Sequence, residues 1–118
     1  MPDRERARSE QLHVEVRRTG DLAIVGLRGE LDLASAPLLE SEIESAARDS
    51  AKLVLDLDAL EFIDSTGLRL ILVAHDRAIE DGRGFAVTKG SAQVRRLLEI
   101  TGVDERLQIV DFPEELLV

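Results

Sequence analysis

Apolar and polar residues alternate along the first part of the chain. Residues 12–18, LHVEVRR, place apolar side chains at every second position, which is the period of a half-buried strand. A turn of four residues, RTGD, leads into residues 22–31, LAIVGLRGEL, which also favour a strand. Because the connection is short, the two strands are predicted to form an antiparallel hairpin. Gly26 interrupts the second strand and is a candidate position for a β-bulge.

The rest of the chain alternates between helical and extended patterns. Apolar residues spaced three and four positions apart predict helices at residues 35–50 and 91–102. Between them a further helix is predicted at residues 68–82, where the first two turns are apolar nearly all round and are expected to be buried. Ser35 and Ser91 are the predicted N-caps of the first and third helices. Short apolar runs predict strands at residues 52–58, 85–88 and 107–110, and residues 113–118 favour one terminal helical turn.

The predicted order is β-β-α-β-α-β-α-β. An opening hairpin followed by strand–helix alternation implies an α/β fold: a mixed sheet of about five strands with helices packed on it. The length of 118 residues suits one domain, which we assign to residues 11–118. Residues 1–10 are charged and lack an apolar pattern, so they are expected to be a flexible lead-in.

Composition narrows the possible partners. Hydrophobic residues make up 44% of the chain but aromatic residues only 3%, so the core is expected to be aliphatic. The absence of cysteine excludes disulfides. A net charge of −9 argues against nucleic acid and anionic membranes as partners. No apolar run has the length of a membrane span, and the N-terminus has no signal-peptide pattern, so a cytoplasmic location is expected. Nothing in the sequence demands an oligomer, so a monomer is expected.

An Asp-x-Asp pair follows the predicted strand at residues 52–58. Phosphotransferases of the haloacid dehalogenase type use such a pair with a threonine two positions later, where this chain has Leu60. Response-regulator receiver domains phosphorylate an aspartate like Asp56, but they need an acidic pair after the first strand to hold magnesium. This chain has a hairpin there. Asp56 and Asp58 are therefore best explained as solvated carboxylates at a strand end.

The remaining catalytic patterns have little support. His13 and His75 are the only histidines, and their spacing does not suit a metal site. The chain has no Gly-x-Ser-x-Gly elbow and no Gly-x-x-x-x-Gly-Lys phosphate loop. The sequence therefore predicts no catalytic residue, no metal and no cofactor.

One stretch of small polar residues interrupts an apolar run at residues 62–71, FIDSTGLRLI. The simplest interpretation is that Ser65 caps the following helix. However, Asp64, Thr66 and Gly67 are also small, so little would shield the Ser65 hydroxyl. The loop after a buried strand is where open α/β sheets place ligand chemistry, and a helix N-terminus tolerates an anion. A phosphate on Ser65 would add about −1.5 to −2 charge beside Asp64 and near Asp32.

Four segments together resemble the anti-sigma factor antagonists, which are stand-alone bacterial STAS domains. They are LRGELDLASAPLL (27–39), LVLDLDAL (53–60), FIDSTGL (62–68) and SAQVRRLLEITGVDERLQIV (91–110). The resemblance extends from about Leu12 to Val110. It implies a STAS-like fold and a switch protein rather than an enzyme.

The resemblance also implies a mechanism. The unphosphorylated domain binds an anti-sigma factor, which then releases its sigma factor. The anti-sigma factor is often a serine kinase that phosphorylates the domain and so ends the complex, and a serine phosphatase restores it. By position, Ser65 is the phosphoacceptor. Gly67 allows close approach. The predicted partner surface consists of Asp32, Asp64, Ser65, Thr66, Gly67 and Arg69.

Arg69 departs from the family pattern, because many relatives have a small residue there. Its side chain could pair with a phosphate on Ser65 or with an acidic partner, or it could be solvated. Two other functions stay open from sequence. One is a STAS adaptor subunit of another assembly, such as a stress-signalling scaffold or a lipid-transport complex. The other is a module that binds nucleotides or small molecules.

Overall fold

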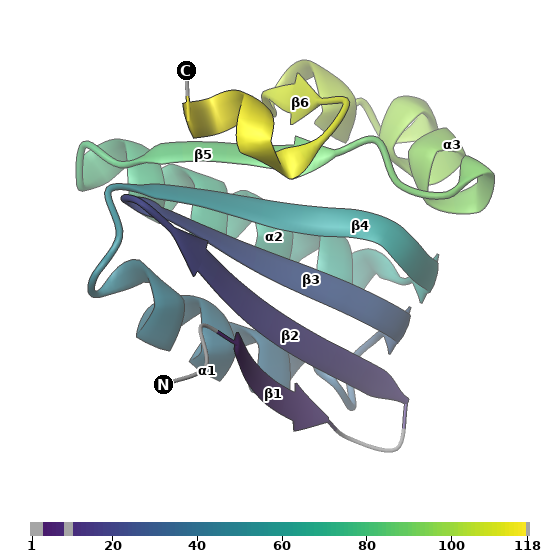
Figure 1. Ribbon diagram of the computed structural model, residues 1–118. Helices are drawn as coiled ribbons and strands as arrows, with labels where there is room; N and C mark the ends of the chain where they lie inside the picture. The colour runs from purple at the N-terminus through teal and green to yellow at the C-terminus, as the bar shows by residue number, and fades with distance from the viewer. Residues whose placement is uncertain (1–3, 9–10, 118) are drawn as a thin grey trace.

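A single mixed sheet organises the molecule (Figure 1). The computed structural model describes the backbone of residues 4–8 and the backbone and side chains of residues 11–117. Within these residues the sheet has six strands in the same order as in the chain. They are β1 (Arg4–Arg8), β2 (Leu12–Thr19), β3 (Leu22–Leu31), β4 (Lys52–Ile63), β5 (Gly84–Thr88) and β6 (Ile109–Val110).

Strand directions follow from the connections. The tight turn between β2 and β3 makes them antiparallel, which confirms the predicted hairpin. From β3 to β6 each neighbouring pair is parallel, and each crossover contains a helix. The helices are α1 (Ala36–Ala47), α2 (Ser65–Glu80) and α3 (Ala92–Ile100). Two 3₁₀ turns, η1 (Val103–Glu105) and η2 (Pro113–Leu117), complete the described chain.

The segment Arg4–Arg8 forms strand β1 and pairs antiparallel with β2. The prediction that residues 1–10 form a flexible lead-in is therefore wrong for these five residues. Pairing along a sheet edge uses backbone N–H and C=O groups, so it does not require the apolar alternation on which the prediction depended. Residues 1–3 and 9–10 lie outside the described part of the chain.

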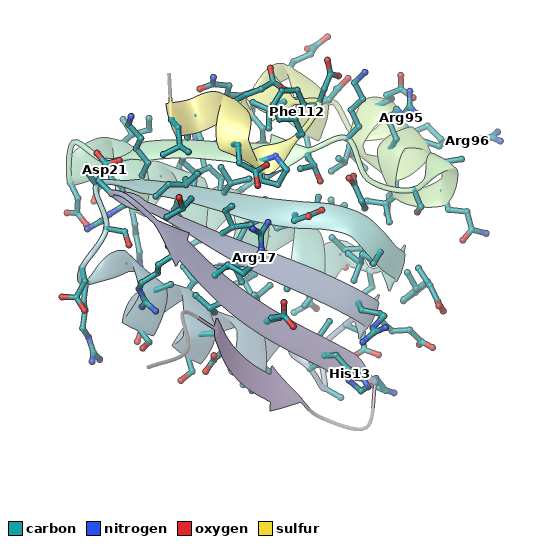
Figure 2. All side chains as sticks on the ribbon, viewed as in Figure 1. His13, Arg17, Asp21, Arg95, Arg96 and Phe112 are labelled. Carbon is teal, nitrogen blue, oxygen red and sulfur yellow. The ribbon has the colours of Figure 1, made fainter. Side chains whose placement is uncertain are left out.

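The two faces of the sheet are covered differently. Helices α1 and α2 lie behind the sheet in Figure 1 and enclose the main core, an aliphatic cluster that includes Leu39, Leu55 and Ile71. On the opposite face η2 covers a smaller cluster at the start of β3, where Leu116 packs against Leu22, Ile24, Val54, Ala86 and Val110. Beyond η2 this second face carries polar side chains. Figure 2 shows His13 and Arg17 of β2 there.

Two of the element boundaries that differ from the prediction shape the candidate site. Strand β4 continues to Ile63 rather than ending near residue 58, and α2 begins at Ser65 rather than Leu68. The β3–β4 pairing contains a register shift between Gly26 and Arg28, so the irregularity expected at Gly26 occurs in the parallel pairing. Only Asp64 separates β4 from α2, which places the small polar residues directly at the helix start.

Candidate functional site

Two loops meet at the carboxyl edge of the sheet. Strands β3 and β4 are parallel and end side by side, with Leu31 opposite Ile63. The loop that follows β3, residues 32–35, therefore lies beside the junction between β4 and α2. This is the edge where open α/β sheets gather their functional groups.

Asp64 fastens the two loops together. Its backbone is extended, and its Oδ1 accepts a hydrogen bond of 2.9 Å from the Gly67 N–H, so Asp64 is the N-cap of α2. Its Oδ2 accepts a second bond, of 3.2 Å, from the N–H of Leu33 in the neighbouring loop. The simplest sequence interpretation, in which Ser65 caps the helix, is therefore wrong. The carboxylate reaches the first-turn N–H from one position earlier.

Asp32 organises the loop after β3. Its Oδ1 accepts hydrogen bonds from the backbone N–H groups of Ala34 (3.0 Å) and Ser35 (3.1 Å). Ser35 is only 1% exposed, and its hydroxyl donates to the carbonyl of Glu30 at 2.9 Å. Ser35 does occupy the predicted N-cap position of α1, but its side chain makes no capping hydrogen bond. Its hydroxyl closes the loop instead.

Ser65 is the first residue of α2 and is exposed. No described residue forms a hydrogen bond with its hydroxyl, and the same holds for the half-buried Thr66. A helix leaves the N–H groups of its first turn without intrahelical acceptors, and Asp64 satisfies that of Gly67. The Ser65 oxygen therefore lies at the positive end of the helix dipole without a structural role of its own.

Gly67 is buried and faces the interior. A Cβ at this position would lie 2.8 Å from both Ile63 Cγ1 and Leu31 Cγ. Glycine therefore lets the first turn of α2 rest directly on the ends of β3 and β4. Gly67 was predicted to belong to the partner surface, but it is buried, and its packing against the two strand ends fixes the position of the first turn that carries Ser65.

Arg69 lies one helical turn beyond Ser65 and is exposed. Within residues 11–117 its guanidinium has neither an ion pair nor a hydrogen bond. The same edge of the sheet also carries two exposed apolar side chains, Leu33 (72% exposed) and Phe62 (49% exposed). Sequence reasoning missed both of them. Each is an apolar residue next to a polar loop motif, and this pattern could have identified both as exposed contact residues.

The Asp-x-Asp pair is structural. Asp56 Oδ1 accepts hydrogen bonds from the Asp58 N–H (3.0 Å) and the Thr88 hydroxyl (3.2 Å). Asp58 Oδ1 accepts from the Gly90 N–H at 3.2 Å. The two carboxylates therefore tie β4 to the end of β5 and to the loop that follows it, a more specific role than the solvated one expected from sequence.

The described residues contain no group of three or more His, Asp or Glu side chains arranged to hold a metal ion. They also contain no helix of the length and apolar character that crossing a membrane requires.

Comparison with known proteins identifies similar chains. The sequence model of the STAS domain matches residues 13–115. The anti-sigma-F factor antagonist RsfB of Mycobacterium tuberculosis is 30% identical over 101 residues, covering 85% of this chain and 82% of the relative. An anti-sigma F factor antagonist of Paenibacillus polymyxa is 31% identical over 102 residues, covering 85% of this chain and 87% of the relative.

A solved structure gives the same result for the fold. The crystal structure of an anti-sigma factor antagonist from Mycobacterium paratuberculosis superposes with a TM-score of 0.82 at 27% sequence identity. The match covers 94% of this chain and 95% of that one. The predicted α/β fold, with its opening hairpin and mixed sheet, is confirmed.

Proposed function

Because this chain belongs to the STAS domain family, we propose that it is an anti-sigma factor antagonist controlled by phosphorylation of Ser65. In its unphosphorylated form it binds an anti-sigma factor in the cytoplasm, and a sigma factor is released. A phosphate on Ser65 ends that binding. The observation that carries the proposal is the exposed Ser65 at the first position of α2, whose hydroxyl forms no hydrogen bond with any described residue.

The relatives support the choice of partner. The proteins from Mycobacterium tuberculosis and Paenibacillus polymyxa are both named as antagonists of an anti-sigma-F factor, and each aligns with most of this chain. A binding role also suits the site, which presents the exposed Leu33 and Phe62 beside polar groups. Exposed apolar side chains of this kind supply contact area in protein interfaces.

The chemistry divides between the two proteins. The kinase supplies the base, the magnesium ions and the nucleotide. The Ser65 oxygen attacks the γ-phosphorus of ATP, the bond from that phosphorus to ADP breaks, and the serine proton passes to the kinase base. A serine phosphatase later hydrolyses the phosphoester. The antagonist therefore needs only an accessible hydroxyl held by a firm scaffold, which Asp64 and Gly67 provide.

Charge explains why the phosphate switches binding off. The phosphate adds about −1.5 to −2 charge at the N-terminus of α2, where the helix dipole favours an anion, so the fold persists. The partner surface changes more. Asp32 and Asp64 already make this edge acidic, and a strongly hydrated dianion next to Leu33 opposes desolvation of the interface. Asp32, Asp64, Thr66 and Arg69 are the other residues proposed to border the partner.

Two measurements test the proposal. The first incubates the protein with a serine-kinase anti-sigma factor of the same organism and ATP, and maps the product by mass spectrometry. Phosphate is expected on Ser65, with no labelling of Ser65→Ala. Labelling of a different residue by an active kinase, or none, would contradict the phosphorylation site.

The second measurement is calorimetric binding to the same anti-sigma factor. Ser65→Ala is expected to bind like the natural protein, whereas Ser65→Asp is expected to bind about 100-fold more weakly. Thr19→Asp is the matched control, because Thr19 is exposed at the β2–β3 turn, at the opposite end of β3 from the site. Equal affinities for Ser65→Ala and Ser65→Asp would overturn the electrostatic switch. Capture of transporter or scaffold subunits with no anti-sigma factor would redirect the assignment to an adaptor.

A further inference from the structure

Arg69 and Ser65 are neighbours on one face of α2. Residues four positions apart on a helix have Cβ atoms about 5–6 Å from each other. Helical side chains also lean toward the N-terminus of their helix, so a long side chain at position 69 extends toward position 65. Both residues are exposed. The Arg69 guanidinium therefore has the reach and the direction to meet a group attached to the Ser65 oxygen.

Two other charged side chains on α2 form ion pairs with residues of neighbouring elements. Arg77 Nη1 lies 3.6 Å from Glu44 Oε1 of α1, and Asp76 Oδ1 lies 3.6 Å from Arg106 Nη2. Arg69 has no such partner within residues 11–117, although the whole chain carries a net charge of −9. An unpaired arginine at this point of an acidic protein is available to bind an anion that arrives later.

We propose that Arg69 is the intramolecular ligand of the phosphate on Ser65. The inference rests on the proposed function, which supplies that phosphate. The planar guanidinium donates two parallel N–H groups to phosphate oxygens, a geometry that a lysine ammonium does not reproduce. The helix dipole acts in the same direction, because Ser65 is the first residue of α2.

This pairing gives phosphorylation a second consequence. In the unphosphorylated protein the Arg69 guanidinium is free to contact acidic groups of a partner. Once the phosphate is present it holds the guanidinium against α2. Phosphorylation then adds negative charge and withdraws a positive one from the same surface.

The surroundings of the phosphate define what the test must separate. The carboxylates of Asp32 and Asp64 lie at this edge and oppose the dianion, although each accepts backbone N–H hydrogen bonds. Arg69 favours the dianion. Removal of Arg69 alone therefore raises the second pKa of the phosphate, while the carboxylates remain unchanged.

The experiment installs phosphoserine at position 65 during translation of the full chain, so that no kinase is required. The phosphorus-31 chemical shift is then followed against pH. The midpoint of this titration is the second pKa of the phosphate. It is expected to lie about 0.5 pH unit lower in the protein with Arg69 than in the Arg69→Gln variant. The difference is expected to shrink in about 1 M salt. Arg69→Lys is expected to give an intermediate midpoint, because it keeps the charge but loses the paired hydrogen bonds.

Arg48→Gln is the matched control. Arg48 is an exposed arginine at the C-terminal end of α1 and has no ion pair among the described side chains. Its removal is expected to leave the midpoint where it is. The same midpoint for Arg69 and Arg69→Gln proteins, or an equal shift from Arg48→Gln, overturns the proposal.

Failure of this inference can be told apart from failure of the proposed function. If the kinase labels Ser65 but the titration midpoint is the same with and without Arg69, the proposed phosphorylation switch is retained and Arg69 is not the phosphate ligand. If the midpoint responds to Arg69 but no anti-sigma kinase labels Ser65, the pairing stands and the switch is wrong.

Discussion

Ser65 and Ser91 lie at the starts of the helices that follow two neighbouring parallel strands, β4 and β5, but their hydroxyl groups have different roles. Ser91 precedes α3 as its N-cap: its hydroxyl accepts a bond of 3.4 Å from the Val94 N–H and donates to the Leu60 carbonyl at 3.0 Å. Ser65 follows β4, but it is the first residue of α2 and therefore lies one position beyond the N-cap. There Asp64 takes the capping role, and the Ser65 hydroxyl has no partner within the described chain.

The difference between these junctions shows how one position decides the use of a hydroxyl. At the N-cap a serine oxygen is bound to the backbone and contributes to stability. At the next position, the first residue of the helix, the serine side chain instead points into solvent, as that of Ser65 does. A modifiable serine therefore needs another residue to cap its helix, and Asp64 meets that requirement. Four substitutions test this contrast.

Gly67→Val is expected to have the largest effect. The added Cβ would lie 2.8 Å from Leu31 and Ile63 atoms, and the two methyl groups enlarge the clash, so the first turn of α2 must lift from the sheet. The expected loss in the free energy of unfolding is about 3 kcal/mol, measured by urea denaturation. Gly84→Ala is the control, since its Cβ would meet mainly the flexible Lys52 side chain. Equal losses from the two variants would show that packing beneath Ser65 is not tight.

Asp64→Ala is expected to destabilise the protein by about 2 kcal/mol. It removes the N-cap bond to Gly67 and the bond to the Leu33 N–H in the neighbouring loop. Urea denaturation measures the loss, and hydrogen exchange at Leu33 and Gly67 is expected to accelerate. Unchanged exchange at Leu33 would mean that Asp64 does not join the two loops in solution.

Ser91→Ala tests the capping serine. Loss of the bond to the Val94 N–H is expected to lower the free energy of unfolding by about 1 kcal/mol. The Leu60 carbonyl also loses its donor. Thermal unfolding followed by circular dichroism gives the measurement, and Ser91→Asp is expected to recover part of the loss because aspartate also caps helices.

Ser65→Ala is expected to have the smallest effect on stability, within about 0.5 kcal/mol, because its hydroxyl makes no hydrogen bond with the described residues. The comparison with Ser91→Ala uses the same denaturation assay. A loss as large as that of Ser91→Ala would remove the distinction between the two serines and imply a structural role for Ser65.

The strands and helices with clear periodicity could be predicted from sequence. The alternation in β2 and the apolar run of β3 gave the hairpin, and Ser91 was correctly identified as a cap. The segment Arg4–Arg8 could not be recognised from an apolar alternation, because its pairing with β2 is made by backbone groups along a sheet edge.

The details of the site were harder to predict. Asp64, Ser65 and Thr66 are all able to cap a helix, so composition alone does not identify which one precedes the first helical residue. The burial of Gly67 depends on Leu31, a residue distant in sequence that only the parallel pairing of β3 and β4 brings close. The exposed position of Ser65 was predicted correctly, but the cap that frees it was not.

The two occupied oxygens of Asp64 limit which residues can stand at that position. Serine and threonine cap helices well, but each has a single side-chain oxygen, whereas the N–H groups of Gly67 and Leu33 bind two different oxygens of Asp64. Asparagine would turn an amide donor toward one of the two N–H groups. Natural variation is therefore expected to be narrow at position 64 and wider at position 91, where serine, threonine, aspartate and asparagine all suit the cap of α3.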